Sequence, residues 1–78
     1  MSEIRSSYAN MRDFAVSSIW VDLSDEINNW LDDIHSQLES EVDHNILMKL
    51  QGNAEACRNI LALPNQMLEA LEIERRTE

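Results

Sequence analysis

The chain has 78 residues, a formal net charge of −9, and a single cysteine, glycine and proline. This length holds one domain at most, residues 1–78, and a lone cysteine excludes an internal disulfide. The acidic balance argues against nucleic acid or a membrane surface as a direct partner, because bound phosphates need Lys and Arg.

The N-terminal residues Met1-Ser2-Glu3-Ile4-Arg5-Ser6-Ser7 lack the apolar segment of a signal peptide. No apolar run approaches the roughly 18 residues of a membrane span. We therefore expect the protein to stay in the cytoplasm of the cell that makes it. Small chains of this kind usually gain stability from a disulfide, a metal or oligomerisation, and oligomerisation or a standing partner is the option that remains.

Apolar residues recur at helical spacing over residues 4–42, which predicts a long amphipathic helix. Two stripes are present, rotated by roughly a third of a turn. The first consists of Ile4, Tyr8, Met11, Ala15 and Ile19, and the second of Val16, Trp20, Leu23, Ile27, Trp30, Leu31, Ile34 and Leu38. Because neither Gly nor Pro enforces a break, we favour one continuous helix; an interruption near residues 17–24 is the alternative, with Ser24 as an N-cap.

Acidic residues occupy the same segment. Between Arg12 and Lys49 there are nine acids and no Lys or Arg. Most of them fall opposite the second stripe, on a surface to which we assign the following residues: Asp25, Asp32, Asp33, Glu39 and Asp43. Solvation of a helix surface explains them adequately. The alternative is binding of a basic protein surface, with mimicry of DNA as its sharpest form.

The second half predicts two further helices. Asp43-His44-Asn45 is the best candidate turn, and helical spacing follows over residues 45–62. Pro64 ends that helix and suits the first position of a third, over about 64–75, followed by a frayed tail at 76–78. The fold class is all-α: an antiparallel hairpin plus a short third helix. The hairpin places Trp30 near Cys57, and Gly52 predicts a close helix approach.

The predicted helix lengths do not match. The first helix would span roughly 50 Å and the second roughly 27 Å, which leaves the N-terminal half without an equal partner. We therefore expect another subunit, another protein, or the short third helix to cover the apolar N-terminal residues. These are Tyr8, Met11, Phe14, Ile19 and Trp20.

No catalytic or cofactor site is predicted. Asp32-x-x-His35 and Glu41-x-x-His44 have metal-ligand spacing, but they point to opposite sides of one predicted helix. Cys57 lies on an apolar stripe, so we expect a buried structural thiol. The chain also lacks a glycine-rich phosphate loop. We expect a protein that is not an enzyme and holds no metal or cofactor.

One resemblance rests on Trp20, Trp30-Leu31, Leu50-Gln51-Gly52-x-Ala54-x-Ala56-x-Arg58 and Leu61-x-Leu63-Pro64. Over residues 20–71 the chain resembles small helical proteins encoded among the head and portal genes of tailed bacteriophages. The resemblance implies a phage origin, a structural or assembly role and a place in the virion. The competing expectation is a small acidic phage inhibitor of a host nucleic-acid-binding or defence protein.

Overall fold

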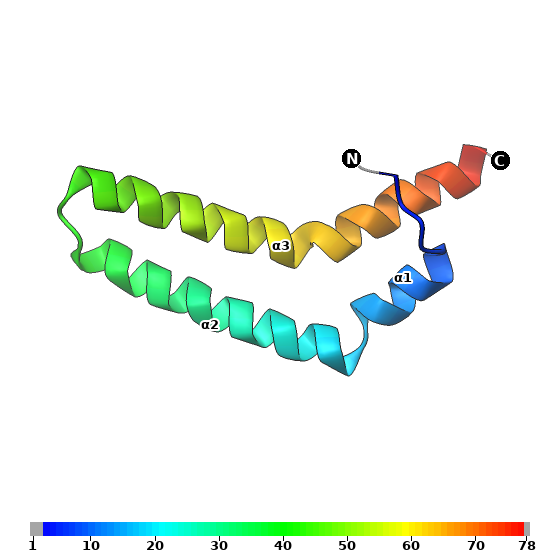
Figure 1. Ribbon diagram of the computed structural model, residues 1–78, viewed down its shortest axis with the longest axis horizontal. Helices are drawn as coiled ribbons and strands as arrows, with labels where there is room; N and C mark the ends of the chain where they lie inside the picture. Colours follow the sequence, from blue (N-terminus) through cyan, green and yellow to red (C-terminus); the bar gives the residue numbers. More distant parts are fainter. Residues whose placement is uncertain (1–2, 78) are drawn as a thin grey trace.

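The computed structural model describes residues 3–77, and it confirms the all-α fold. Within these residues the helices are α1 (Tyr8–Ala15), α2 (Ser18–Ser40) and α3 (His44–Thr77). Helix α2 packs antiparallel against the first half of α3 as a hairpin, and α1 packs along the second half of α3 (Figure 1). One long helix thus has two shorter partners in succession.

The long N-terminal helix that we favoured is wrong, because α1 and α2 are separated at Val16 and Ser17. The Ser17 hydroxyl donates to the Phe14 carbonyl at 2.7 Å and accepts from the Trp20 backbone N–H at 3.1 Å. It therefore ends one helix and caps the next. Serine competes for backbone hydrogen bonds in this way without any need for Gly or Pro.

The turn between α2 and α3 is built by two acidic side chains. Glu41 Oε1 accepts from the backbone N–H groups of Val42 and Asp43, at 3.0 and 2.9 Å. Asp43 then caps α3, since its Oδ1 accepts from the Ile46 N–H at 3.1 Å. The predicted turn, Asp43-His44-Asn45, therefore overlaps the observed one at Asp43, which is the N-cap, while His44 and Asn45 already belong to α3.

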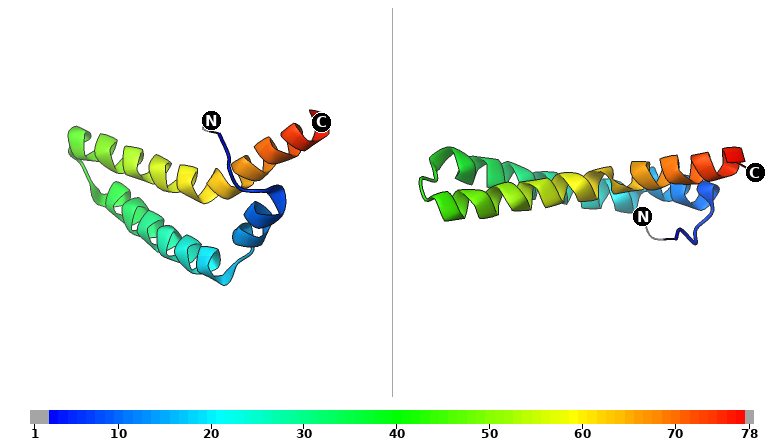
Figure 2. Two further views of the ribbon diagram at one scale, coloured as in Figure 1. Left: turned by 45° about the vertical axis from the view of Figure 1, so that its right-hand side comes forward. Right: turned by 90° about the horizontal axis from the view of Figure 1, so that it is seen from above.

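The predicted division at Pro64 is wrong: α3 is a single helix of 34 residues with Pro64 inside it. Proline has no N–H to donate to the Ile60 carbonyl, and its ring displaces that carbonyl, so the helix bends instead of ending. Figures 1 and 2 show this bend in the middle of α3. The predicted frayed tail is likewise helical to Thr77, and Glu78 lies outside the described residues.

The three helices form a single layer. The molecule measures 52 × 26 × 15 Å, and its radius of gyration is 16.2 Å. A compact domain of this length would have a radius of about 11.5 Å. The buried side chains lie along the seam between α3 and its two partners, and Figure 2 shows the flat shape from above. They are Ile27, Leu50, Ala54, Cys57, Pro64 and Leu71.

One packing expectation fails and one is confirmed. Trp30 lies at the edge of the seam with 52% of its surface exposed. Gly52 marks no close helix approach, because a Cβ added there would meet no atom within 4 Å. The Cys57 thiol is buried and free, as predicted.

Replacing Ser17 by alanine should lower the free energy of unfolding by about 1 kcal/mol, because α2 loses its N-cap and the Phe14 carbonyl of α1 loses a hydrogen-bond donor. Ser18→Ala, one residue further and inside α2, is the matched control and should stay within about 0.5 kcal/mol of wild type. Urea unfolding followed by circular dichroism measures both. Equal losses for the two variants would contradict the capping role.

Candidate functional site: an apolar groove and face

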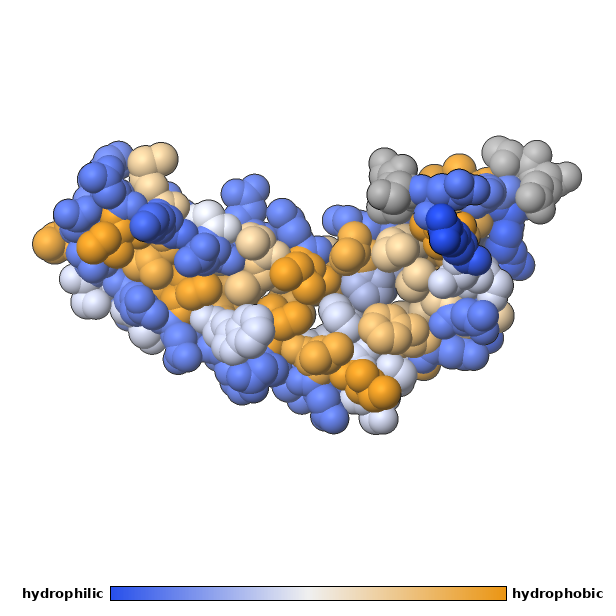
Figure 3. All heavy atoms as spheres, viewed as in Figure 1, coloured by the Kyte–Doolittle hydropathy of each residue, from blue (hydrophilic) through white to orange (hydrophobic). Residues whose placement is uncertain are grey.

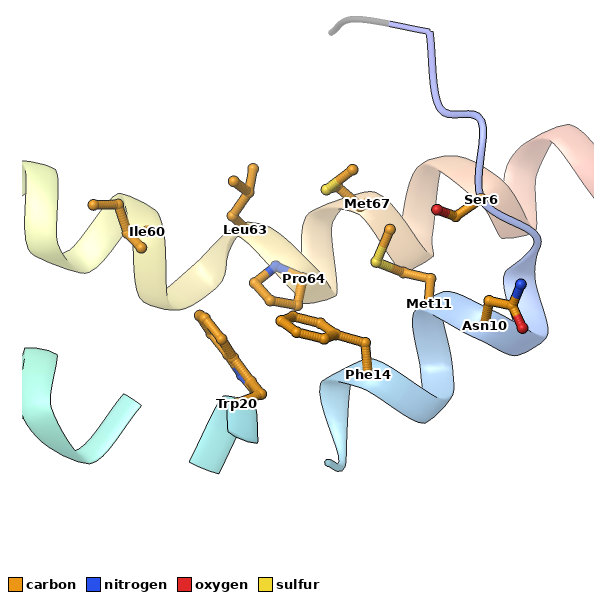
Figure 4. A pocket seen from close by; sticks show the side chains of 9 residues that line it. All are labelled: Ser6, Asn10, Met11, Phe14, Trp20, Ile60, Leu63, Pro64 and Met67. Carbon is orange, nitrogen blue, oxygen red and sulfur yellow. The ribbon is translucent and has the colours of Figure 1, made fainter. Parts of the chain in front are cut away.

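A groove of about 440 Å³ opens where α1, the start of α2 and the middle of α3 meet. Figure 4 shows Phe14 and Trp20 reaching from α1 and α2 toward Pro64 on α3. Among residues 3–77 no charged side chain lines the groove, and two polar residues stand at one end. The lining residues are Ser6, Asn10, Met11, Phe14, Trp20, Ile60, Leu63, Pro64 and Met67.

Aromatic packing holds the floor of this groove. The Phe14 and Trp20 ring centroids lie 5.5 Å apart with the ring planes tilted by 42°. Such tilted pairs contribute about 0.5–1.5 kcal/mol beyond the area they bury. Because Ser17 lies between the two rings in the sequence, the break it causes turns Phe14 back toward Trp20. The helix break and the groove therefore have one origin.

Three of the five predicted N-terminal residues line the groove: Met11, Phe14 and Trp20. Tyr8 lies beyond it, where the Arg75 guanidinium carbon sits 4.5 Å from the ring centroid. Ile19 is exposed and outside the groove. The apolar N-terminal residues are thus split between a groove, an ion–ring contact and open surface.

The predicted length mismatch is also wrong. Because α3 continues through Pro64, its 34 residues span roughly 51 Å and reach past α2 to cover α1. Sequence reasoning therefore missed that Ile60, Leu63 and Pro64 meet the N-terminal segment. The signal was present, since Cys57, Leu61, Pro64, Leu68 and Leu71 recur at spacings of 4, 3, 4 and 3. That stripe crosses the proline without interruption.

The groove continues into an exposed apolar surface. At about 100° per residue, with Ile27 pointing inward on α2, Leu23 and Trp30 lie about 40° and 60° to one side. With Cys57 pointing inward on α3, Ile60 and Leu63 lie about 60° and 120° to the same rotational side. Antiparallel helices that face each other present that side to one common surface of the layer.

We call this surface the apolar face. Its residues each expose more than a third of their surface: Phe14, Ile19, Leu23, Trp30, Ile60 and Leu63. Figure 3 shows apolar side chains running along the front from the hairpin end to the helix junction, with hydrophilic side chains beside them and a hollow at the junction. Trp30 is oriented there by its indole N–H, which donates to Glu26 Oε1 at 3.0 Å.

The predicted acidic residues are all exposed: Asp25, Asp32, Asp33, Glu39 and Asp43. Four of them lie on the outer side of α2, about 120° to 160° from Ile27, away from α3. Asp43 differs, because its carboxylate caps α3. The structure thus brings four of the five together along one edge and uses the fifth for folding.

The part of the chain that the structure describes contains no cluster of potential metal ligands. Among residues 3–77, no three His, Cys, Asp or Glu side chains come together in a way that could hold a metal ion. Glu41, from one of the two candidate metal-ligand pairs, accepts hydrogen bonds from the backbone of the turn.

No described helix combines the length and the apolar character needed to cross a bilayer.

Comparison with family models, with curated protein sequences and with solved structures gave no match.

Replacing Arg75 by glutamine should destabilise the fold by about 0.5–1 kcal/mol, because the contact with Tyr8 helps hold α1 on α3. Arg76→Gln is the matched control: its guanidinium pairs with Glu72 at 3.1 Å in solvent, and exposed pairs contribute little. Thermal unfolding of both variants measures the difference. A larger loss for Arg76→Gln would show that the ion–ring contact does not hold α1.

Proposed function

We propose that this chain is a helical protein–protein interaction protein, not an enzyme, and that its binding surface is the apolar face with the junction groove. The observation that carries the proposal is the continuity of the two. An open apolar groove runs into half-exposed side chains of α2 and α3 on the same side of the layer. Contiguous apolar patches of this kind mark protein contacts in soluble proteins.

The composition of the surface supports binding more than chemistry. Trp30 and Phe14 are aromatic anchors of the type that contributes most to protein interfaces. Within the described part of the chain, the groove has no charged side chain, and its polar lining residues are Ser6 and Asn10. A proposed setting is the particle of a tailed bacteriophage, or its assembly in the host cytoplasm, which the resemblance over residues 20–71 supports.

Leu63→Gln should reduce about tenfold the amount of partner protein that copurifies with this chain from the cells that make it. The reason is that the substitution places an amide on the apolar face. Ile73→Gln is the matched control on the same helix. Leu63 and Ile73 are 44% and 61% exposed, but Ile73 lies on the outer side of α3, away from the apolar face. Equal recovery with both variants would contradict the proposal.

A second candidate function uses the acidic edge. Asp25, Asp32, Asp33 and Glu39 are exposed, and α2 carries no Lys or Arg that could neutralise them. The edge can therefore attract a basic surface, such as the nucleic-acid groove of a host protein. This candidate is an inhibitor, with mimicry of DNA as its sharpest form, as opposed to an assembly component.

The triple substitution Asp32→Lys, Asp33→Lys and Glu39→Lys separates the two candidates. An inhibitor of a basic target should lose binding by about tenfold or more, since three attractive charges become repulsive. Binding through the apolar face should change little, because these carboxylates lie on the outer edge of α2. Titration of the captured protein with both forms gives the measurement.

A further inference from the structure

We propose that a second copy of this chain covers the apolar face, with α2 of each copy packed on α3 of the other. The two-fold axis runs along the length of the molecule between the two faces. This inference rests on the proposed function and names the occupant of the surface. It replaces an unspecified partner with a symmetric, self-complementary contact.

The shape of the molecule favours a second layer of equal size. The broad side of the molecule measures 52 × 26 Å, whereas its thickness of 15 Å is little more than one helix. Domains are built from two packed layers around one core, and a stable interface covers about 800 Å² on each partner. The broad side has room for a contact of that size. Two copies placed face to face form the missing layer, with all neighbouring helices antiparallel.

The charges of the helices favour packing of α2 on α3 of the second copy over packing of α2 on α2. Helix α2 holds six acids and no Lys or Arg, while α3 holds four acids and four bases. If α2 packed on α2, two uncompensated acidic helices would lie side by side. If α2 packs on α3, each acidic helix meets a neutral one. The outer carboxylates of α2 then stay at the edge of the assembly, away from the contact.

Side-chain size supports the same order. Counted back from the turn, Trp30 lies level with about residues 54–56 of α3. Packing α2 on α3 of the second copy therefore places Trp30 over the segment that contains Ala56. Ala56 is exposed and lies about 100° from Cys57, on the same side as Ile60. A large ring over a small side chain allows close packing of the two helices.

Sedimentation velocity between about 1 and 100 μM tests the proposal. Wild type should sediment as a dimer, and Leu23→Gln should weaken the dimer about tenfold or more. Val21→Gln is the matched control. Leu23 and Val21 are both 49% exposed on α2, but they point to opposite surfaces of the layer. Equal weakening by both would overturn the assignment to the apolar face.

Ala56→Gln tests the packing of α2 on α3 of the second copy. Ala56 is exposed in the single chain, so the helix content of the variant should stay at the wild-type value. Its dimer should weaken about tenfold, because the larger side chain meets Trp30 of the second copy. Undiminished dimerisation would overturn the placement of α2 on α3.

Salt gives an independent measurement. Two chains of charge −9 repel each other, so dimer affinity should rise between about 50 and 500 mM NaCl. A fall would show attraction between opposite charges at the contact and would overturn the proposal. A wild-type monomer at every concentration would overturn it too. In that case the proposed function still stands if Leu63→Gln lowers capture of another protein, and it fails if capture is unchanged.

Discussion

A single seam holds this molecule together. Helix α3 presents one apolar stripe along its whole length, and α2 and α1 pack against that stripe one after the other. Every buried side chain lies on this seam. Since a helix pair buries only the stripe between its members, the flanks of all three helices stay exposed. The groove, the apolar face and the acidic edge are the uncovered parts of a structure with one line of contact.

Two small local features decide how that seam is filled. Ser17 ends α1 and begins α2 through a shared hydroxyl, so the chain can turn back and continue along α3. Pro64 bends α3 without ending it, so the stripe stays continuous from Leu50 to Leu71. Had Ser17 not intervened, Phe14 would point away from Trp20. Had Pro64 ended the helix, α1 would have no long partner.

The sequence was sufficient for the helical class, for a turn at Asp43 and for the burial of Cys57, because each rests on spacing or on local capping. It was insufficient at Ser17 and Pro64, where local preference and tertiary packing compete. A serine inside a helical pattern can either continue the helix or cap a new one, and the packing of its neighbours determines which. A proline inside a helix lowers stability by an amount that packing can offset. Of the site residues, Met11, Phe14 and Trp20 could be predicted from their stripe. The contribution of Ile60 and Leu63 depended on α3 crossing Pro64.

The contact between Tyr8 and Arg75 joins residues near opposite ends of the described chain. Helix α1 has eight residues and none of them is buried, whereas the hairpin of α2 and α3 buries Ile27, Leu50, Ala54 and Cys57. Because α1 gains little from burial, its detachment costs less free energy than opening of the hairpin. We therefore expect amide hydrogens in α1 to exchange faster than those in the hairpin. The junction groove is consequently the part of the molecule whose shape changes at the smallest free-energy cost.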